Sequence, residues 1–380
     1  MDEDNTKTGA IARAEIARST RSRFFGDYAQ ARDVLRSKTV SQGGSGIQTL
    51  KEADPDDVTL FYLDGEPHKQ RRAAITRFFS LKTIEEKYEP VMHRCAETLI
   101  SRLENSGEED LATLTFHYAV AVAADVIGLD YSDVAGLAHK IGTIIAEGNG
   151  QRSVKGFDDP DLLGFYDDVV QPVIDKRRLE PREDIISNMI ARGHHDRFIR
   201  TEVRAYSVAG MATTREFISM AAWYLLEQPG LLERYRTGDA ADQFAILDEI
   251  IRLEPVVGAL KREALEPMTI PELGEVSKGD IVGIDIRKAN LTEAAVGACP
   301  HRFDPDRENS MPPKTGYMSF GDGMHRCPGA MLSMHETRIF LDKLVRVPGL
   351  RLVSEPRVAW YRPLTSYEIE NFVVACERFD

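Results

Sequence analysis

The stretch Phe320-Gly321-Asp322-Gly323-Met324-His325-Arg326-Cys327-Pro328-Gly329 places a single cysteine among three glycines. Its first two glycines, Gly321 and Gly323, permit turns in which the backbone comes close to a flat ligand, because no Cβ stands in the way. Pro328 suits the first position of a helix, where its missing N–H costs nothing. Apolar residues then recur at helical spacing and predict a helix from Gly329 to about Val345. Cys327 would therefore lie at a helix N-terminus, which favours a thiolate.

A thiolate in such a turn is a good ligand for a soft, electron-poor metal, and backbone N–H groups can bond to its sulfur and tune it. The alternative role for a single cysteine is that of a small buried hydrophobe. That role fits Cys95, Cys299 and Cys376 well. The four cysteines show no paired spacing, so we expect neither a disulfide framework nor a zinc site, and a reducing cytosol fits.

The stretch resembles the haem-thiolate signature of the cytochrome P450 family, Phe-Gly-x-Gly-x-His-x-Cys-x-Gly. A chance match to these fixed positions is on the order of one in a hundred thousand for a chain of this length. The resemblance implies that Cys327 ligates the iron of haem b (iron protoporphyrin IX). It also implies that other residues of the signature contact the haem, namely Phe320, Gly321, His325 and Gly329.

The family fold that this resemblance implies is mainly α with a small β region, a triangular helical domain with small β-sheets. We expect residues 1–380 to form this single haem domain with no fused reductase. A hydrophobic fraction of 42% and a charged fraction of 29% are ordinary for a soluble globular protein. The net charge of −13 argues against nucleic acid as a partner, because phosphate binding needs a basic surface.

The N-terminal residues Met1–Ala10 are polar and charged, so they predict neither a signal peptide nor a membrane anchor. The most apolar run, Ala119–Leu129, contains Asp125 and is too short to span a bilayer. We therefore expect a cytoplasmic protein that does not associate with membranes. We also expect it to be a monomer.

The pattern in the first part of the chain predicts a helical region over residues 11–38 and a loop over Ser41–Asp57, which is rich in Gly, Ser, Asp and Pro. The position of this loop matches the loop that covers the haem pocket in the family. A second break, Gly148–Pro160, predicts the loop that roofs the active site.

A helix is predicted to open at Gly65, with His68 and Arg72 one turn apart on one face. The resemblance implies that these two side chains bind the haem propionates, and arginine suits carboxylates through its fork of donors. Arg71 would replace Arg72 if the register is off by one residue. The alternative is an ordinary solvated basic turn.

A longer helix is predicted from about Glu202 to Glu227, capped by Thr201 and ended before Pro229. Its centre, Ala209–Thr214, resembles the oxygen-binding segment of the family and implies that Ala209 and Gly210 contact the haem. Thr213 can donate to the carbonyl of Ala209 and so loosen the helix. The small side chains at helical spacing indicate either tight helix packing or a substrate pocket lined by Ala205, Val208 and Ala212.

The chain departs from the family at Ala212, where relatives generally carry a carboxylate that relays protons. The candidate substitutes for this carboxylate are Glu216 and ordered water. The alternative is that Arg215 and Glu216 form a solvated pair on the far face of the helix. The candidate catalytic residues are therefore Thr213, Thr214 and Glu216.

Four further segments carry predictions. The spacing of Glu249 and Arg252 is that of an ordinary surface pair, but in the family Glu-x-x-Arg is structural and would be completed here by Arg302. The apolar Val256–Leu260 is expected to line the pocket through Val256 and Val257, with Arg262, or alternatively Lys261, on a propionate. The segment Gly279–Asp285 alternates like a strand. A hairpin at Tyr361–Tyr367 would bring Leu364 to the substrate.

The resemblance thus predicts a monooxygenase that inserts one oxygen atom from O₂ into a largely apolar small molecule. Electrons would come from a separate ferredoxin or flavodoxin, docked on a basic patch of Arg71, Arg77 and Arg326. Because Ala212 cannot relay protons and hydrogen peroxide supplies its own, a peroxide-driven oxygenase or another atypical oxidation is an alternative. A further alternative, which is not an enzyme, is a haem protein that serves as a sensor or a ligand carrier.

Overall fold

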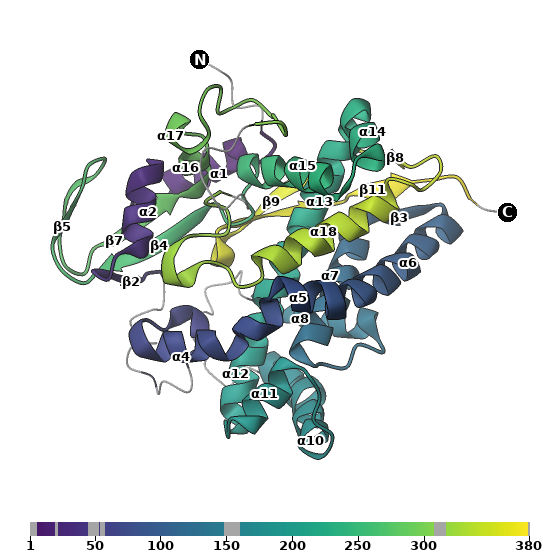
Figure 1. Ribbon diagram of the computed structural model, residues 1–380, viewed down its shortest axis with the longest axis horizontal. Coiled ribbons are helices and arrows are strands. Elements are labelled where there is room, and N and C mark those ends of the chain that lie inside the picture. The colour runs from purple at the N-terminus through teal and green to yellow at the C-terminus, as the bar shows by residue number, and fades with distance from the viewer. Residues whose placement is uncertain are drawn as a thin grey trace. The chain divides into compact units, whose positions relative to one another are not determined.

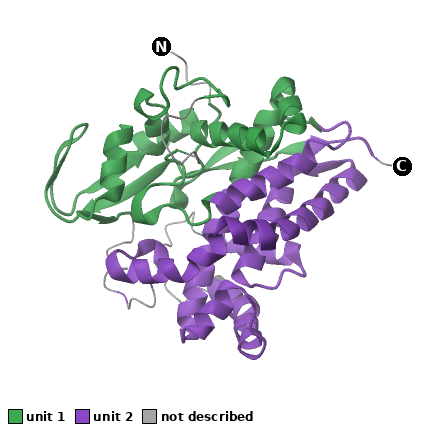
Figure 2. Cartoon of the chain, viewed as in Figure 1, with its two compact units in different colours: residues 1–44, 216–330, 351–373 green, residues 45–215, 331–350, 374–380 purple. Residues whose placement is uncertain are grey.

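The computed structural model describes residues 6–19, 22–44, 53, 58–147, 160–307 and 317–378. Helices dominate and the sheets are small (Figure 1), which confirms the predicted fold class. Figure 2 shows two compact units: unit 1 comprises residues 1–44, 216–330 and 351–373, and unit 2 comprises residues 45–215, 331–350 and 374–380. A single haem domain over the whole chain remains a prediction. No helix of the described part combines the length and the apolar character that crossing a membrane requires.

Unit 1 contains the four-stranded sheet, and its elements are, in chain order, α1 (Gly9–Ala17), β1 (Arg23–Phe25), α2 (Tyr28–Arg36), β2 (Val40–Gln42), most of α13 (Thr213–Glu227), α14 (Pro229–Thr237), α15 (Ala240–Leu253), β4 (Ala259–Ala264), β5 (Met268–Ile270), β6 (Gly274–Val276), β7 (Ile281–Asp285), α16 (Ile286–Asn290), α17 (Glu293–Val296), η7 (Gly323–His325), β8 (Arg351–Leu352), β9 (Arg357–Tyr361), η8 (Arg362–Leu364), β10 (Ser366–Glu370) and the start of β11 (Val373–Ala375).

Unit 2 is almost entirely helical, and its elements are η2 (Leu60–Tyr62), α4 (Gly65–Ile75), η3 (Thr76–Phe79), α5 (Leu81–Thr83), η4 (Ile84–Tyr88), α6 (Glu89–Ser106), β3 (Glu108–Asp110), α7 (Leu111–Ile127), α8 (Val134–Glu147), α9 (Pro160–Phe165), η5 (Tyr166–Val170), α10 (Gln171–Leu179), α11 (Ile185–Ala191), α12 (Asp196–Ser207), η6 (Val208–Ala212) and nearly all of α18 (Ala330–Leu344).

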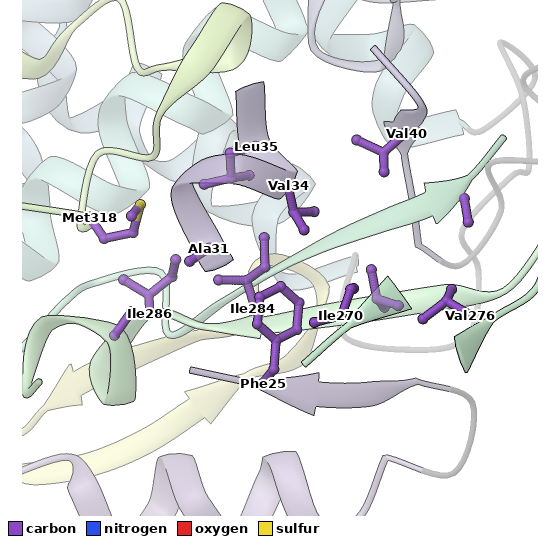
Figure 3. Close-up of a cluster of buried hydrophobic side chains, with 13 residues drawn as sticks. Phe25, Ala31, Val34, Leu35, Val40, Ile270, Val276, Ile284, Ile286 and Met318 are labelled. Atoms are coloured by element: carbon purple, nitrogen blue, oxygen red, sulfur yellow. The ribbon is translucent and has the colours of Figure 1, made fainter. Parts of the chain in front are cut away.

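The main sheet of unit 1 has the strand order β1-β7-β4-β2, with β1 parallel to β7 and the other pairs antiparallel. Helix α2 and this sheet share a buried apolar cluster (Figure 3). The cluster includes Leu35 of α2, Ile284 of β7 and Met318, which comes just before the cysteine loop. Burial of these side chains therefore fixes the start of that loop against the sheet.

The prediction of one helical region over residues 11–38 is wrong, because β1 interrupts it. Phe25 is buried in the apolar cluster and pairs with Ile284 of β7. Asp27 then caps α2, since its side chain accepts from the Gln30 N–H at 2.9 Å. The predicted strand at Gly279–Asp285 is confirmed as β7. Of the predicted loop at Ser41–Asp57, Ser41 and Gln42 belong to β2 and nearly all the rest lies outside the described residues, as does most of Gly148–Pro160.

The predicted start of the long helix is also wrong. The helical run begins at Asp196, where the His195 Nδ1 accepts from the Phe198 N–H at 3.2 Å. Thr201 lies inside α12 and donates to the carbonyl of Arg197 at 2.9 Å. The buried side chains of Phe198 and Ile199 extend the apolar face of the helix beyond the predicted start.

Glu249 and Arg252 form a buried pair, with Arg252 fully buried and its Nε 2.9 Å from the Glu249 Oε2. The second guanidinium comes from Arg307, whose Nε donates to the Glu249 Oε1 at 3.1 Å. The prediction of Arg302 is wrong, because its side chain is exposed. Arg302 contributes only its carbonyl, which accepts from Arg252 at 3.1 Å and from Arg307 at 3.0 Å.

Candidate functional site

The cysteine loop of unit 1 is closed by its own backbone. The Gly321 N–H donates to the carbonyl of Met318 at 2.8 Å, and the Cys327 N–H donates to the carbonyl of Phe320 at 2.9 Å. Between them lies the short turn η7, which ends at the half-buried His325. The Cys327 side chain is exposed and takes part in no disulfide. The loop therefore presents one sulfur at a fixed position.

Helix α18 begins at Ala330 and ends at Leu344, one residue inside the predicted limits at each end. Pro328 and Gly329 form a turn ahead of it. Cys327 thus precedes the helix by this turn, and the predicted thiolate stabilisation by the helix N-terminus is weaker than the sequence indicated, because the dipole acts mainly within the first turn.

Helix α2 holds the cysteine loop from one side, within unit 1. The Asp322 Oδ2 accepts from the Arg36 Nε at 3.1 Å and lies 3.4 Å from the Arg32 Nε. Gly323 has a φ of +68°, and a Cβ added to it would lie 2.2 Å from the carbonyl oxygen of Leu35. Gly321 has a φ of +70°, but the nearest atom to an added Cβ is 3.6 Å away.

The two glycines provide a matched test of this packing. Gly321→Ala is expected to lower the free energy of unfolding by about 1 kcal/mol, which is the cost of the left-handed backbone alone. Gly323→Ala adds the clash with the Leu35 carbonyl, so we expect a loss of about 3 kcal/mol. Urea unfolding of both variants measures the difference. Equal losses would show that Gly323 does not pack against α2 as described.

Helix α4 of unit 2 presents the predicted anion-binding pair, with His68 buried and Arg72 half-buried. The neighbouring Arg71 donates to the Val58 carbonyl at 2.6 Å and to the Glu202 Oε1 at 3.0 Å. Because Glu202 already holds Arg71, the geometry favours Arg72 for an external carboxylate. Arg71 is also only 13% exposed, so its assignment to a surface patch with Arg77 and Arg326 is wrong.

Glu202 is a buried partner of Arg71 that the sequence did not reveal. Its carboxylate is buried, accepts from the Leu60 N–H at 2.8 Å, and so ties η2 to α12. Burial raises the pKa of Glu202, while its hydrogen bond with Tyr206 and the Arg71 charge lower it. Its partners are remote in the chain, and no local pattern marks a carboxylate for such a role.

The centre of the long helix departs from regular α-helical hydrogen bonding, as the sequence predicted. Residues Val208–Ala212 form the π-helical turn η6, and the Thr213 Oγ1 donates to the carbonyl of Ala209 at 2.7 Å. Ala209 is exposed on this turn, as the close approach of a flat group requires. An added Cβ on Gly210 would lie 3.6 Å from the Ala123 side chain of α7, so Gly210 faces a helix of its own unit.

The other predicted pocket residues of this run differ in exposure. Ala205 and Val208 are half-buried, whereas Ala212 and Thr214 are buried. Glu216 is buried in unit 1, and its Oε2 accepts from the Ile369 N–H of β10 at 2.8 Å. The alternative of a solvated Arg215–Glu216 pair is therefore wrong for Glu216.

Within unit 1 the hairpin of β9 and β10 holds the apolar segment that was predicted to line the pocket. Val257 forms a bridge with Ser366, and the Gly258 N–H donates to the carbonyl of Thr365 at 2.8 Å. Val256 is buried and Leu364 is half-buried at the turn η8. The hairpin therefore fixes the segment that carries Val256 and Val257.

The remaining predicted propionate contact is Arg262 of β4, whose side chain is buried. Its Nη1 donates to the Gln42 Oε1 at 2.7 Å and to the carbonyl of Lys261 at 2.8 Å. Lys261 is half-buried, and burial lowers its pKa. Alternate residues of a strand point to opposite faces, so Arg262 shares the sheet face of Leu260. The Cδ1 of Leu260 would lie 3.6 Å from a Cβ added to Gly321.

Taken one by one, these residues have the chemistry that a haem requires of its protein ligands. Cys327 supplies a single soft donor for iron, and Arg72 and Arg262 carry the fork of donors that carboxylates require. The exposed Ala209, beside the hydroxyl of Thr213, leaves a helix surface without bulk. Cys327 and Arg262 belong to unit 1, and Arg72, Ala209 and Thr213 belong to unit 2.

Known proteins resemble this chain in both sequence and fold. The family model described as "Cytochrome P450" matches residues 244–347. Cytochrome P450-SOY of Streptomyces griseus is 27% identical over 80% of this chain and 73% of its own length. The biotin biosynthesis cytochrome P450 of Bacillus subtilis (strain 168) is 25% identical over 84% of this chain and 80% of its own.

The solved structures agree with this. CalO2 has a TM-score of 0.80 and 20% identity, covering 99% of this chain and 98% of its own. P450BioI, in complex with an acyl carrier protein ligated to hexadec-9Z-enoic acid, has a TM-score of 0.77 and 23% identity, covering 93% and 92%. Together with the cysteine loop, these matches in sequence and fold show that the chain belongs to the cytochrome P450 family and is a haem-thiolate monooxygenase.

Proposed function

We propose that this protein inserts one oxygen atom from O₂ into a small molecule that is largely apolar, with electrons from a separate ferredoxin or flavodoxin in the cytoplasm. The observation that carries the proposal is the exposed Cys327 sulfur on a loop closed by its own backbone. The cofactor is haem b, which when bound supplies the activation of oxygen.

The residues of the chain bind and orient this group. Cys327 holds the iron, and the anchoring of its loop by Asp322 and Gly323 keeps the sulfur in place. His68, Arg72 and Arg262 bind the propionates, the arginines through paired N–H donors. The exposed Ala209 would present a helix surface without bulk to the flat group, and Val256 and Val257 would contribute apolar side chains to the substrate pocket.

Proton supply is assigned to Thr213 with ordered water. The Thr213 hydroxyl donates to the carbonyl of Ala209, and its oxygen can still accept from a water. Ala212 has no proton to give. The Glu216 Oε2 accepts from the backbone of β10, so we assign this carboxylate to the support of the hairpin and not to proton transfer.

The variant Thr213→Val tests this assignment. Electron-supported product formation is expected to fall at least about tenfold, and more hydrogen peroxide should be released for each electron pair consumed. Peroxide-supported turnover should hardly change, because peroxide carries its own protons. Product and peroxide are measured with both electron sources, with Thr214→Val as the neighbouring hydroxyl control. Equal loss with both sources would exclude Thr213 from proton supply.

The second candidate function is a peroxide-driven oxygenase, which Ala212 favours. The same assay on the unmodified protein separates the two candidates. Faster turnover with peroxide than with any reduced ferredoxin or flavodoxin would favour the second candidate. Reduced ferredoxin or flavodoxin as the better source would favour the first.

A further inference from the structure

Helix α12 of unit 2 carries a row of side chains that leads toward the opened turn. Arg200, Arg204 and Val208 follow one another at four-residue spacing, so they lie on one side of the helix. The Arg200 guanidinium lies 3.0 Å from the Asp167 carboxylate, and its Nε donates to the Gln171 Oε1 at 2.9 Å. The charge of Arg200 is therefore balanced within the unit.

Arg204 differs from Arg200. It is half-buried, and no described residue supplies a carboxylate within ion-pair distance of its guanidinium. The charge of Arg204 acts on the phenols of Tyr62 and Tyr166. Burial raises the pKa of both phenols, and the Arg204 charge lowers it. A half-buried cation gains from an anion that completes its hydrogen bonds.

The surroundings of Arg204 also offer apolar surface. Phe61 and Tyr62 of η2 are 55% and 38% exposed, with ring centroids 4.9 Å apart. Glu202 ties η2 to α12, so these rings stay near the helix. From Arg204 to Val208 the α-helix rises about 6 Å, at about 1.5 Å per residue, and the π-helical turn η6 continues it to Ala212. The helix therefore carries a cation, Arg204, at one end of this stretch and the small side chain of Ala212 at the other. The stretch between them suits the length of a medium-sized ligand.

We infer that Arg204 binds the carboxylate of an amphipathic substrate whose apolar part extends along Val208 toward Ala212. A guanidinium matches a carboxylate with two parallel N–H donors, which a neutral head group cannot use as well. The direction toward Ala212 rests on the proposed function, since oxidation takes place at that end. The anchoring by Arg204 requires only the geometry of unit 2.

Isothermal titration calorimetry of the haem-loaded protein tests this inference. The ligands are dodecanoic, tetradecanoic and hexadecanoic acids, each compared with the primary alcohol of equal chain length. The unmodified protein is expected to bind at least one acid roughly 10-fold to 100-fold tighter than its alcohol. Arg204→Gln should remove this preference, and Arg204→Lys should keep part of it because the charge remains.

The matched control is Arg197→Gln, which removes the same charge from an exposed position on the same helix. It should leave the preference for the acid unchanged. The inference is overturned if no acid binds tighter than its alcohol, if the preference survives in Arg204→Gln, or if Arg197→Gln removes it equally.

The carbon monoxide difference spectrum of the same samples separates this inference from the proposed function. A thiolate band together with no preference for acids contradicts the role of Arg204 alone. An Arg204-dependent preference without a thiolate band contradicts the haem-thiolate function and leaves the anion site in place.

Discussion

Cys327→Ser is expected to lose the thiolate spectrum and to lower electron-supported turnover about a hundredfold or more. Serine keeps the size of the side chain and the backbone bond to the Phe320 carbonyl, but its hydroxyl is a poor donor to iron. Because the Cys327 side chain is exposed, the free energy of unfolding should change by no more than about 0.5 kcal/mol. The measurements are the carbon monoxide difference spectrum, product formation and thermal unfolding.

Cys299→Ser is the control for this variant, because Cys299 is also exposed but lies outside the loop. Its exposure shows that the prediction of a small buried hydrophobe is wrong for Cys299. Cys299→Ser should retain both the spectrum and the turnover. Full turnover in Cys327→Ser would contradict the assignment of Cys327 as the iron ligand. Loss of the thiolate band in Cys299→Ser would contradict it as well.

Glu249→Gln is expected to lower the free energy of unfolding by about 3 to 5 kcal/mol. The carboxylate balances two guanidiniums, those of Arg252 and Arg307, and its removal leaves both charges buried without a counter-ion. Urea unfolding followed by circular dichroism measures the loss.

Arg302→Ala and Arg307→Ala form the matched pair for this cluster. Arg302→Ala should change stability by no more than about 0.5 kcal/mol, because only the carbonyl of Arg302 takes part. Arg307→Ala should cost several times as much. If Arg302→Ala proved the more damaging of the two, Arg307 would not be the partner of Glu249.

The features that the sequence predicted correctly are local. The cysteine loop is built from contacts between residues a few positions apart, such as the N–H of Cys327 and the carbonyl of Phe320. The bond from Thr213 to Ala209 spans one helical turn. Spacing and residue type are enough for such contacts, since the backbone geometry of a turn or helix follows from them.

The features that were missed join residues far apart in the chain. Arg71 meets Glu202 across 131 positions, and Glu216 meets Ile369 across 153. Strand β1 exists because β7 offers it an edge, and a short apolar segment alone does not distinguish this from a helix. Helical spacing likewise did not tell that Gly210 faces α7, because a glycine has no side chain to mark its direction.

The most direct test of the haem-thiolate assignment is the absorption difference spectrum of the dithionite-reduced protein with and without carbon monoxide. A strongly red-shifted band is predicted, because the thiolate of Cys327 would ligate the haem iron under the proposed assignment. A band typical of histidine-ligated or free haem would contradict Cys327 as the ligand.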